Sequence, residues 1–121
     1  MSRSILIVDD EIEVLNILEE RLKANGYHVM KASGSVEAAK KIKEEGVPAL
    51  VLLDLEIPVV NGFGFLKALR KYKPTENTPG IMQTAQRHTA NILKAQELKV
   101  TDYLSKPCKA EDLLNTIKRY I

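Results

Sequence analysis

Short apolar runs alternate along the chain with stretches in which apolar residues recur every three or four positions. Residues 5–8 form an unbroken run of branched side chains, which is the pattern of a strand buried on both faces. Residues 14–22 then place their apolar side chains on one face of a helix, which Gly26 is expected to end. The same pattern predicts strands at residues 5–8, 27–32, 49–53, 81–84 and 100–104.

Amphipathic stretches separate these strands and follow the last of them. Their spacing predicts helices at residues 14–22, 36–42, 65–69, 88–98 and 113–121, of which the fourth has only a thin apolar face. Strands that alternate with helices indicate a parallel sheet with helices on both faces and right-handed crossovers. The expected fold class is therefore α/β, a single doubly wound (βα)5 domain over residues 1–121 with a five-stranded parallel sheet.

The composition narrows the classes of function. The 121 residues suit one domain, and 45% hydrophobic with 28% charged residues is ordinary for a soluble globular protein. The net charge is only +2 with lysines and glutamates interleaved, so we expect no direct nucleic-acid binding. The apolar runs are too short to cross a membrane, and the single cysteine, Cys108, cannot form an internal disulfide. We expect a cytoplasmic protein.

The chemically useful side chains fall at the ends of the predicted strands. Asp9 and Asp10 follow the first strand, and Asp54 follows the third. Thr84 closes the fourth strand, and Lys106 follows the fifth. In an open parallel sheet, ligands bind outside the carboxyl ends of the strands, at the switch in strand order. The sequence therefore predicts that these five residues share one site.

Three carboxylates at one edge of a sheet repel one another unless a cation balances them. Mg²⁺ suits such a site, because it takes oxygen ligands and is typically held by one or two carboxylates plus phosphate. Asp54 could then attack a phosphoryl group and form an aspartyl phosphate. The Lys106 ammonium and the Thr84 hydroxyl would meet the charge on the transferring group, and the small Ala85 would leave room above Asp54.

Each of these residues also has an interpretation that needs no site. Asp10 and Glu13 could be a helix N-cap and its return partner. Asp54 could simply end a strand, and Lys106 could be a solvated lysine. Tyr103 would ordinarily pack at the edge of a sheet. The occurrence of these residues together, rather than any one of them, favours a functional site.

Four segments of the chain resemble the receiver domains of two-component response regulators. They are Ile-Leu-Ile-Val-Asp-Asp-Glu at residues 5–11, Leu-Leu-Asp-Leu-Glu-Ile-Pro-Val-Val-Asn-Gly at residues 52–62, Thr-Ala at residues 84–85 and Asp-Tyr-Leu-Ser-Lys-Pro at residues 102–107. They occur in the right order across the whole chain. The resemblance implies a flavodoxin-like strand order, 2-1-3-4-5, and a magnesium-dependent phosphorylation switch.

The resemblance also implies a role for each site residue. A histidine kinase or a phosphotransfer protein would phosphorylate Asp54. Asp10 and Asp54 would bind Mg²⁺ (or Mn²⁺) directly, while Asp9 would act through water and Glu56 through its backbone carbonyl. Lys106 would hold the phosphoryl oxygens.

The signal would then leave through a second set of residues. Thr84 would move toward the phosphoryl group, and Tyr103 would turn inward, which changes the face made by the fourth helix, the fifth strand and the fifth helix. A downstream protein or effector domain would bind there, and the same face would also serve a homodimer. Phosphoryl access and lifetime would depend on Ala85, Glu56 and Gln86.

Three positions depart from the family pattern. Lys99 stands where receivers usually carry a glycine, and it would be strained if a left-handed backbone conformation is needed there. Gly80 falls in the fourth strand, where a glycine in the interior weakens pairing. Gln83 is polar where an aliphatic side chain is common. None of these residues belongs to the predicted phosphoryl site.

Two other functions remain open. One is a receiver-like interaction module that is never phosphorylated, although every reactive position is present. The other is a magnesium phosphatase of the haloacid dehalogenase kind, but the second aspartate of that motif corresponds here to Glu56, and the chain is short for a substrate cap. We therefore do not expect an enzyme that acts on an external substrate. The expected chemistry is limited to phosphoryl transfer to Asp54 and self-catalysed hydrolysis of the aspartyl phosphate.

Overall fold

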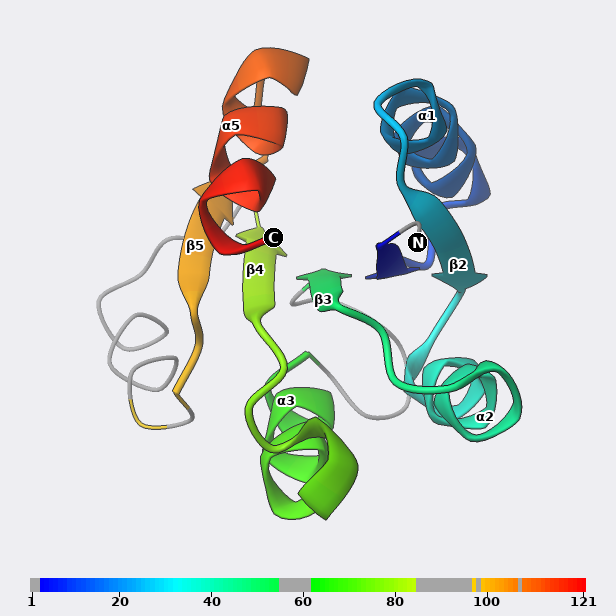
Figure 1. The fold of residues 1–121 in the computed structure, drawn as a ribbon, viewed down its shortest axis with the longest axis vertical. Coiled ribbons are helices and arrows are strands. Elements are labelled where there is room, and N and C mark those ends of the chain that lie inside the picture. Colours follow the sequence, from blue (N-terminus) through cyan, green and yellow to red (C-terminus); the bar gives the residue numbers. More distant parts are fainter. Residues whose placement is uncertain (1–2, 55–61, 85–96, 98, 107) are drawn as a thin grey trace.

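Five parallel strands form the centre of the computed structural model, which describes residues 3–54, 62–84, 97, 99–106 and 108–121. The strands are β1 (Ser4–Val8), β2 (His28–Ala32), β3 (Leu50–Asp54), β4 (Gly80–Thr84) and β5 (Asp102–Ser105). Their order in the sheet is β2-β1-β3-β4-β5, which confirms the predicted fold class and strand order (Figure 1).

Helices cover both faces of the sheet. α1 (Ile12–Ala24) and α5 (Ala110–Tyr120) lie on one face, and α2 (Ser35–Glu45) and α3 (Gly62–Lys71) lie on the other (Figure 1). A short 3-10 helix, η1 (Lys73–Thr75), connects α3 to β4. The predicted fourth helix, residues 88–98, falls outside the described residues apart from residue 97. Within the described ranges, no helix is long and apolar enough to cross a membrane.

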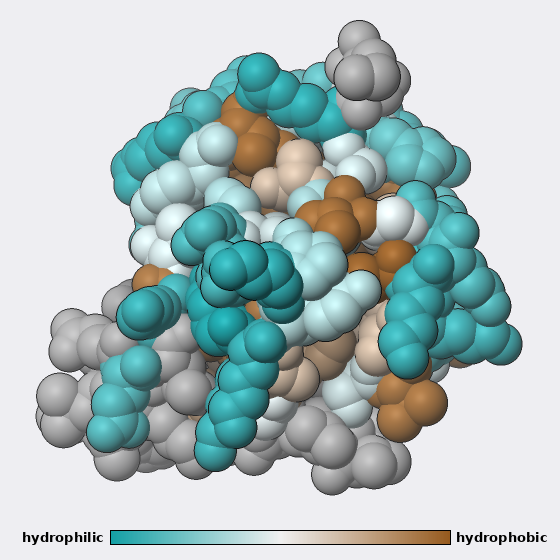
Figure 2. Space-filling view, turned by 60° about the horizontal axis from the view of Figure 1, so that its bottom comes forward, coloured by the Kyte–Doolittle hydropathy of each residue, from teal (hydrophilic) through white to brown (hydrophobic). Residues whose placement is uncertain are grey.

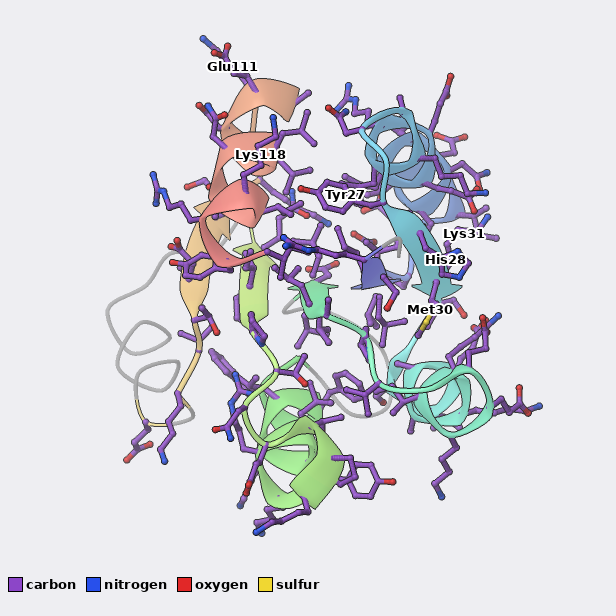
Figure 3. All side chains as sticks on the ribbon, viewed as in Figure 1. Tyr27, His28, Met30, Lys31, Glu111 and Lys118 are labelled. Atoms are coloured by element: carbon purple, nitrogen blue, oxygen red, sulfur yellow. The ribbon has the colours of Figure 1, made fainter. Side chains whose placement is uncertain are left out.

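Successive residues of each strand point to opposite faces of the sheet and divide the core into two clusters. Ile5 packs with the apolar residues of α1 and α5, whereas Leu6 packs with those of α2 and α3. Figure 3 shows the same division beside β2, where Tyr27 reaches between α1 and α5 and Met30 points toward α2. Both faces of the sheet are therefore buried, as the unbroken apolar runs predict.

All five strands have boundaries that differ by one or two residues from the predicted ones, and the differences at β3 and β5 have a clear cause in the hydrogen bonding. β3 includes Asp54, which the apolar pattern places just after the strand, because the ladder with β4 continues to the pair of Asp54 and Gln83. β5 begins at Asp102 rather than at residue 100. The preceding Thr101 already bonds to Gly80, through its N–H to the Gly80 carbonyl oxygen at 2.8 Å and from the Gly80 N–H to its hydroxyl at 2.9 Å.

Gly80 is the first residue of β4, so it does not interrupt the interior of a strand as we expected from the sequence. A Cβ at this position would lie 3.2 Å from Cδ1 of Leu66 and 3.4 Å from Nη2 of Arg70. Both side chains come from α3. The missing side chain of Gly80 therefore allows α3 to approach the start of β4 closely.

Lys99 adopts a left-handed backbone conformation, with a φ of 57°. Its Cβ is therefore strained, as expected for a residue other than glycine with a left-handed backbone. Its carbonyl oxygen accepts hydrogen bonds from Nη2 of Arg70 at 3.0 Å and from Nε of Arg70 at 3.3 Å. Arg70 also donates from Nη1 to the carbonyl oxygen of Thr78 at 2.7 Å. One arginine of α3 therefore holds both the strained residue before β5 and the loop before β4.

Replacing Lys99 with glycine is expected to raise the free energy of unfolding by about 0.5–1 kcal/mol, because the relief of Cβ strain exceeds the entropy that glycine loses on folding. Urea denaturation measures the change. Lys99→Ala is the matched control, since it removes the charge and keeps the Cβ. An equal gain in both variants would mean that backbone strain is not the cause.

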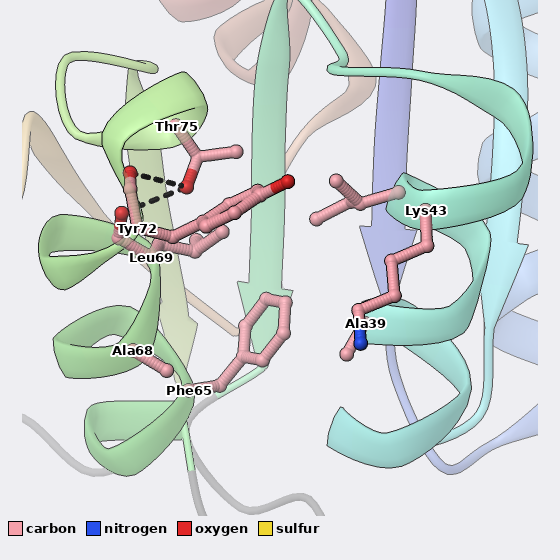
Figure 4. A pocket seen from close by; sticks show the side chains of 8 residues that line it. Ala39, Lys43, Phe65, Ala68, Leu69, Tyr72 and Thr75 are labelled. Carbon is pink, nitrogen blue, oxygen red and sulfur yellow. Dashed lines mark hydrogen bonds between the residues drawn. The ribbon is translucent and has the colours of Figure 1, made fainter.

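A hollow of about 140 Å³ lies between α2 and α3 (Figure 4). Its lining is mostly apolar and includes Ala39 and Phe65. The Thr75 hydroxyl beside it is bonded to the carbonyl oxygens of Leu69 at 2.8 Å and Tyr72 at 3.3 Å. Figure 2, with the α3 end turned forward, shows hydrophobic patches between hydrophilic side chains. None of the predicted site residues lines this hollow.

Candidate functional site

Asp9, Asp10 and Asp54 meet at the carboxyl edge of the sheet. β1 and β3 pair with Val8 opposite Leu53, so the residues that follow each of them are neighbours. One oxygen of each carboxylate lies within 4.8 Å of the others. Asp9 is 2% exposed and Asp54 is 7% exposed, whereas Asp10 faces solvent. The fold therefore brings together the three carboxylates that the sequence placed at one edge, two of them buried.

The ammonium of Lys106 bridges the two buried carboxylates. Its Nζ lies 2.6 Å from Oδ2 of Asp9 and 3.3 Å from Oδ2 of Asp54. Burial of the ammonium lowers its pKa, but the Asp9 hydrogen bond and the charges of Asp54 and Asp9 outweigh burial and raise the pKa above its usual value. Because folding raises this pKa, the stabilisation is present at neutral pH and is lost only as pH rises through the folded-state pKa.

Asp9 is held by a second short contact. Its Oδ1 accepts a hydrogen bond from the backbone N–H of Glu11 at 3.0 Å. Glu11 is the N-cap of α1, and no side chain caps this helix by a hydrogen bond. The alternative in which Asp10 and Glu13 cap the helix is therefore wrong, because the chain turns at Asp9 and the helix begins only at Ile12. The structure leaves Asp10 exposed beside the two buried carboxylates.

The structure describes the remaining predicted site residues only in part. The backbone of Thr84 ends β4 at the same edge of the sheet. Tyr103 is half-buried and packs against the cluster formed with α2 and α3. Glu56, Ala85 and Gln86 lie outside the described residues. Their roles stay predictions.

One pair of residues near the site was not identified from the sequence as a unit. The side chain of Gln83 is 7% exposed, and its Nε2 donates a hydrogen bond to Sγ of Cys108 at 3.5 Å. From the sequence, Gln83 was identified only as a departure from the family pattern and Cys108 only as a single cysteine. The available signal was the polar residue itself, since a buried amide requires a hydrogen-bond partner.

The donor set at this edge fits a hard cation. Its ligands would be carboxylate oxygens, which Mg²⁺ and Mn²⁺ prefer, and the exposed Asp10 leaves the cluster open to solvent. The negative charge of three carboxylates also exceeds the single charge that Lys106 supplies. The acidic cluster therefore has the ligand chemistry that a divalent cation takes, and the Lys106 ammonium lies beside it.

Comparison with known proteins identifies the family of the chain. The response regulator receiver domain family matches residues 5–118. A probable transcriptional regulator ycf27 of Porphyridium aerugineum is 38% identical over 109 residues, which are 90% of this chain and 44% of that protein. The alkaline phosphatase synthesis transcriptional regulatory protein PhoP of Bacillus subtilis is 34% identical over 118 residues, which are 98% of this chain and 48% of that protein. The chain thus spans less than half the length of these relatives.

Solved structures show the same fold. The chemotaxis protein CheY4 of Vibrio cholerae aligns over 100% of both chains, with a TM-score of 0.94 and 29% identity. The receiver domain of the sensor histidine kinase PA1611 of Pseudomonas aeruginosa covers 99% of this chain and 98% of its own, with a TM-score of 0.88 and 23% identity. That structure was solved with a magnesium ion coordinated in its active site cleft. At this identity the second likeness shows the fold alone.

Proposed function

The chain belongs to the family of response regulator receiver domains of two-component signalling, and from that premise we propose that it is a switch that accepts a phosphoryl group on Asp54. The observation that carries this proposal is the convergence of three carboxylates and one ammonium at the carboxyl edge of the sheet. A structural role would not require two buried carboxylates to share one lysine, because burying charges costs free energy. A phosphoryl-transfer site uses such groups, with a lysine at the phosphoryl oxygens and carboxylates that hold a metal ion.

Asp54 suits the role of phosphoryl acceptor better than its buried neighbour. Both oxygens of Asp9 are engaged in short contacts, one with the Glu11 N–H at 3.0 Å and one with Lys106 at 2.6 Å. Asp9 is therefore held as a supporting group. Asp54 also matches the phosphorylated position in the family resemblance.

The transfer would form a bond between a carboxylate oxygen of Asp54 and phosphorus. The bond from phosphorus to the nitrogen or oxygen of the donor would break, and its electron pair would leave with the donor. The Lys106 ammonium, already beside Asp54, would donate hydrogen bonds to the phosphoryl oxygens. A magnesium or manganese ion held by Asp10, Asp54, the Glu56 carbonyl and, through water, Asp9 would neutralise charge on those oxygens.

The partners follow from this role. The donor would be a histidine kinase or a phosphotransfer protein, and the recipient of the signal would be a downstream protein or an effector domain. The relatives named as transcriptional regulators are about twice as long as the chain, which supports an effector of that kind. The protein would not turn over an external substrate. Its own chemistry would be limited to phosphoryl transfer to Asp54 and hydrolysis of the aspartyl phosphate.

Tyr103 is suited to report the state of the site. It pairs in register with Met82, two residues before Thr84, and it is half-buried. We propose that Thr84 and Tyr103 move together after phosphorylation and change the face that includes β5 and α5, where a target or a second copy would bind. The residues proposed to set phosphoryl access and lifetime are Ala85, Glu56 and Gln86.

Phosphorylation of Asp54 is tested directly by mass. Incubation with acetyl phosphate and Mg²⁺ is expected to add one phosphoryl group, which base removes because an acyl phosphate hydrolyses readily. Asp54→Asn should abolish the adduct, since the amide lacks the nucleophilic carboxylate oxygen. Asp112→Asn, at an exposed residue of α5, is the control and should retain it. An adduct of equal yield in Asp54→Asn would show that Asp54 is not the acceptor.

A further inference from the structure

Gln83 places a polar side chain in the sheet directly beside the acidic edge. It pairs in register with Asp54 of β3 on one side and with Leu104 of β5 on the other. Ile81, two residues earlier in β4, packs with the cluster formed by α1 and α5, so Gln83 points to that same face. A buried amide is costly in the sheet unless it is hydrogen-bonded, and this one is 7% exposed.

The partner of this amide belongs to the connection that carries the site lysine. Cys108, whose Sγ accepts the hydrogen bond from Gln83, comes two residues after Lys106 and before α5. It is half-buried and packs against the same cluster as Ile81. The bond therefore joins β4, next to Asp54, to the segment between β5 and α5.

The backbone around Lys106 is tied to β4 on both sides. Ser105, immediately before it, pairs in register with Thr84. Cys108, after it, is bonded to Gln83. A long lysine side chain gains precision when its backbone is fixed, and charge stabilisation at a reacting group depends on such precision. The two ties would fix the point from which Nζ reaches the carboxylates.

We propose that Gln83 is a positioning residue for Lys106 and acts through its hydrogen bond to Cys108. The proposal rests on the proposed function, in which the Lys106 ammonium holds the phosphoryl oxygens. Loss of the bond leaves the ammonium present but less well placed. The rate of phosphoryl transfer falls, whereas the carboxylates keep their affinity for metal.

The test compares the rate at which acetyl phosphate and Mg²⁺ phosphorylate four forms of the full chain, followed by intact mass. Gln83→Leu and Cys108→Ala are each expected to lower this rate about threefold to tenfold, the equivalent of one neutral hydrogen bond. The double variant should be no slower than either single variant, because both remove the same interaction. Additive losses would overturn the proposal.

Three controls separate positioning from a general loss of structure. Met82→Leu alters a buried neighbour on the same strand that packs with α2 and α3, and it should leave the rate unchanged. Cys108→Ser keeps an acceptor for the amide and should recover most of the rate, but only while Gln83 is present. Mg²⁺ affinity should stay at the wild-type value in every variant, whereas a disrupted site would lose it.

The outcomes distinguish this proposal from the one on which it rests. If the wild-type chain takes up no phosphoryl group, the proposed function fails and the positioning role fails with it. If the wild-type chain is phosphorylated and Gln83→Leu matches its rate, only the positioning role is wrong. A rate loss in Cys108→Ser equal to that in Cys108→Ala would also contradict a role for the hydrogen bond.

Discussion

Replacing Lys106 with methionine is expected to lower the free energy of unfolding by about 2–4 kcal/mol without divalent metal, because Asp9 and Asp54 would remain buried without their shared counter-charge. The Lys106 side chain keeps 21% of its surface exposed, which places the effect below that of a fully buried pair. Methionine retains the length and the apolar stem of lysine. Added Mg²⁺ should stabilise the variant more than the wild type, since metal would then replace the missing charge.

Urea denaturation with EDTA and again with Mg²⁺ measures both parts of this expectation. Lys109→Met is the matched control, because Lys109 is an exposed lysine of the same connection and a substitution there should change stability by less than about 0.5 kcal/mol. A variant at position 106 that is as stable as this control would mean that the two carboxylates do not depend on the ammonium. An equal effect of Mg²⁺ on variant and wild type would remove the link between lysine and metal.

Replacing Arg70 with methionine is expected to lower the free energy of unfolding by about 2–3 kcal/mol, the sum of several hydrogen bonds to carbonyl oxygens, of which those of Thr78 and Glu76 are partly buried. The guanidinium donates to Thr78 at 2.7 Å and to Lys99 at 3.0 Å, with a longer contact to Glu76 at 3.3 Å. Burial lowers the pKa of this guanidinium, because partial desolvation disfavours its charged form. Without it, the loop before β4 and the strained residue before β5 lose their common donor.

Two companion variants identify the origin of that loss. Arg70→Lys keeps the charge but cannot reproduce the fork of donors, so it should recover less than half of the lost stability. Lys71→Met changes the adjacent, exposed residue of α3 and should have little effect. Full recovery with lysine would show that charge, rather than the geometry of the hydrogen bonds, accounts for the role of Arg70.

Much of the site could be predicted because the sheet topology determines which residues lie at the carboxyl edge. Unbroken apolar runs indicate parallel strands buried on both faces, and such strands end at a common edge. Asp9 follows β1 and Asp54 is the last residue of β3. Their proximity could therefore be predicted without knowledge of side-chain packing. The exact end of β3 was less predictable, since hydrogen bonding to β4 rather than apolar pattern decides it.

Contacts between distant residues could not be predicted in this way. Asp9 and Lys106 lie 97 positions apart, and the order of strands brings their backbones near each other but does not say which carboxylate holds the ammonium more closely. The alternative interpretation of Asp10 and Glu13 as a helix cap is wrong for a related reason. The turn at Asp9 instead uses one oxygen of its own carboxylate, and the other oxygen contacts Lys106, which is distant in the sequence.

The sequence by itself determined the sheet, its two buried faces and the edge at which the acidic residues gather, because these follow from local periodicity and from chain order. Tertiary structure alone decided that Arg70 holds the strained Lys99, 29 positions away, and that Gln83 bonds to Cys108, 25 positions away. Such bonds depend on the distance between side chains after the helices pack. No repeating pattern along the chain encodes that distance.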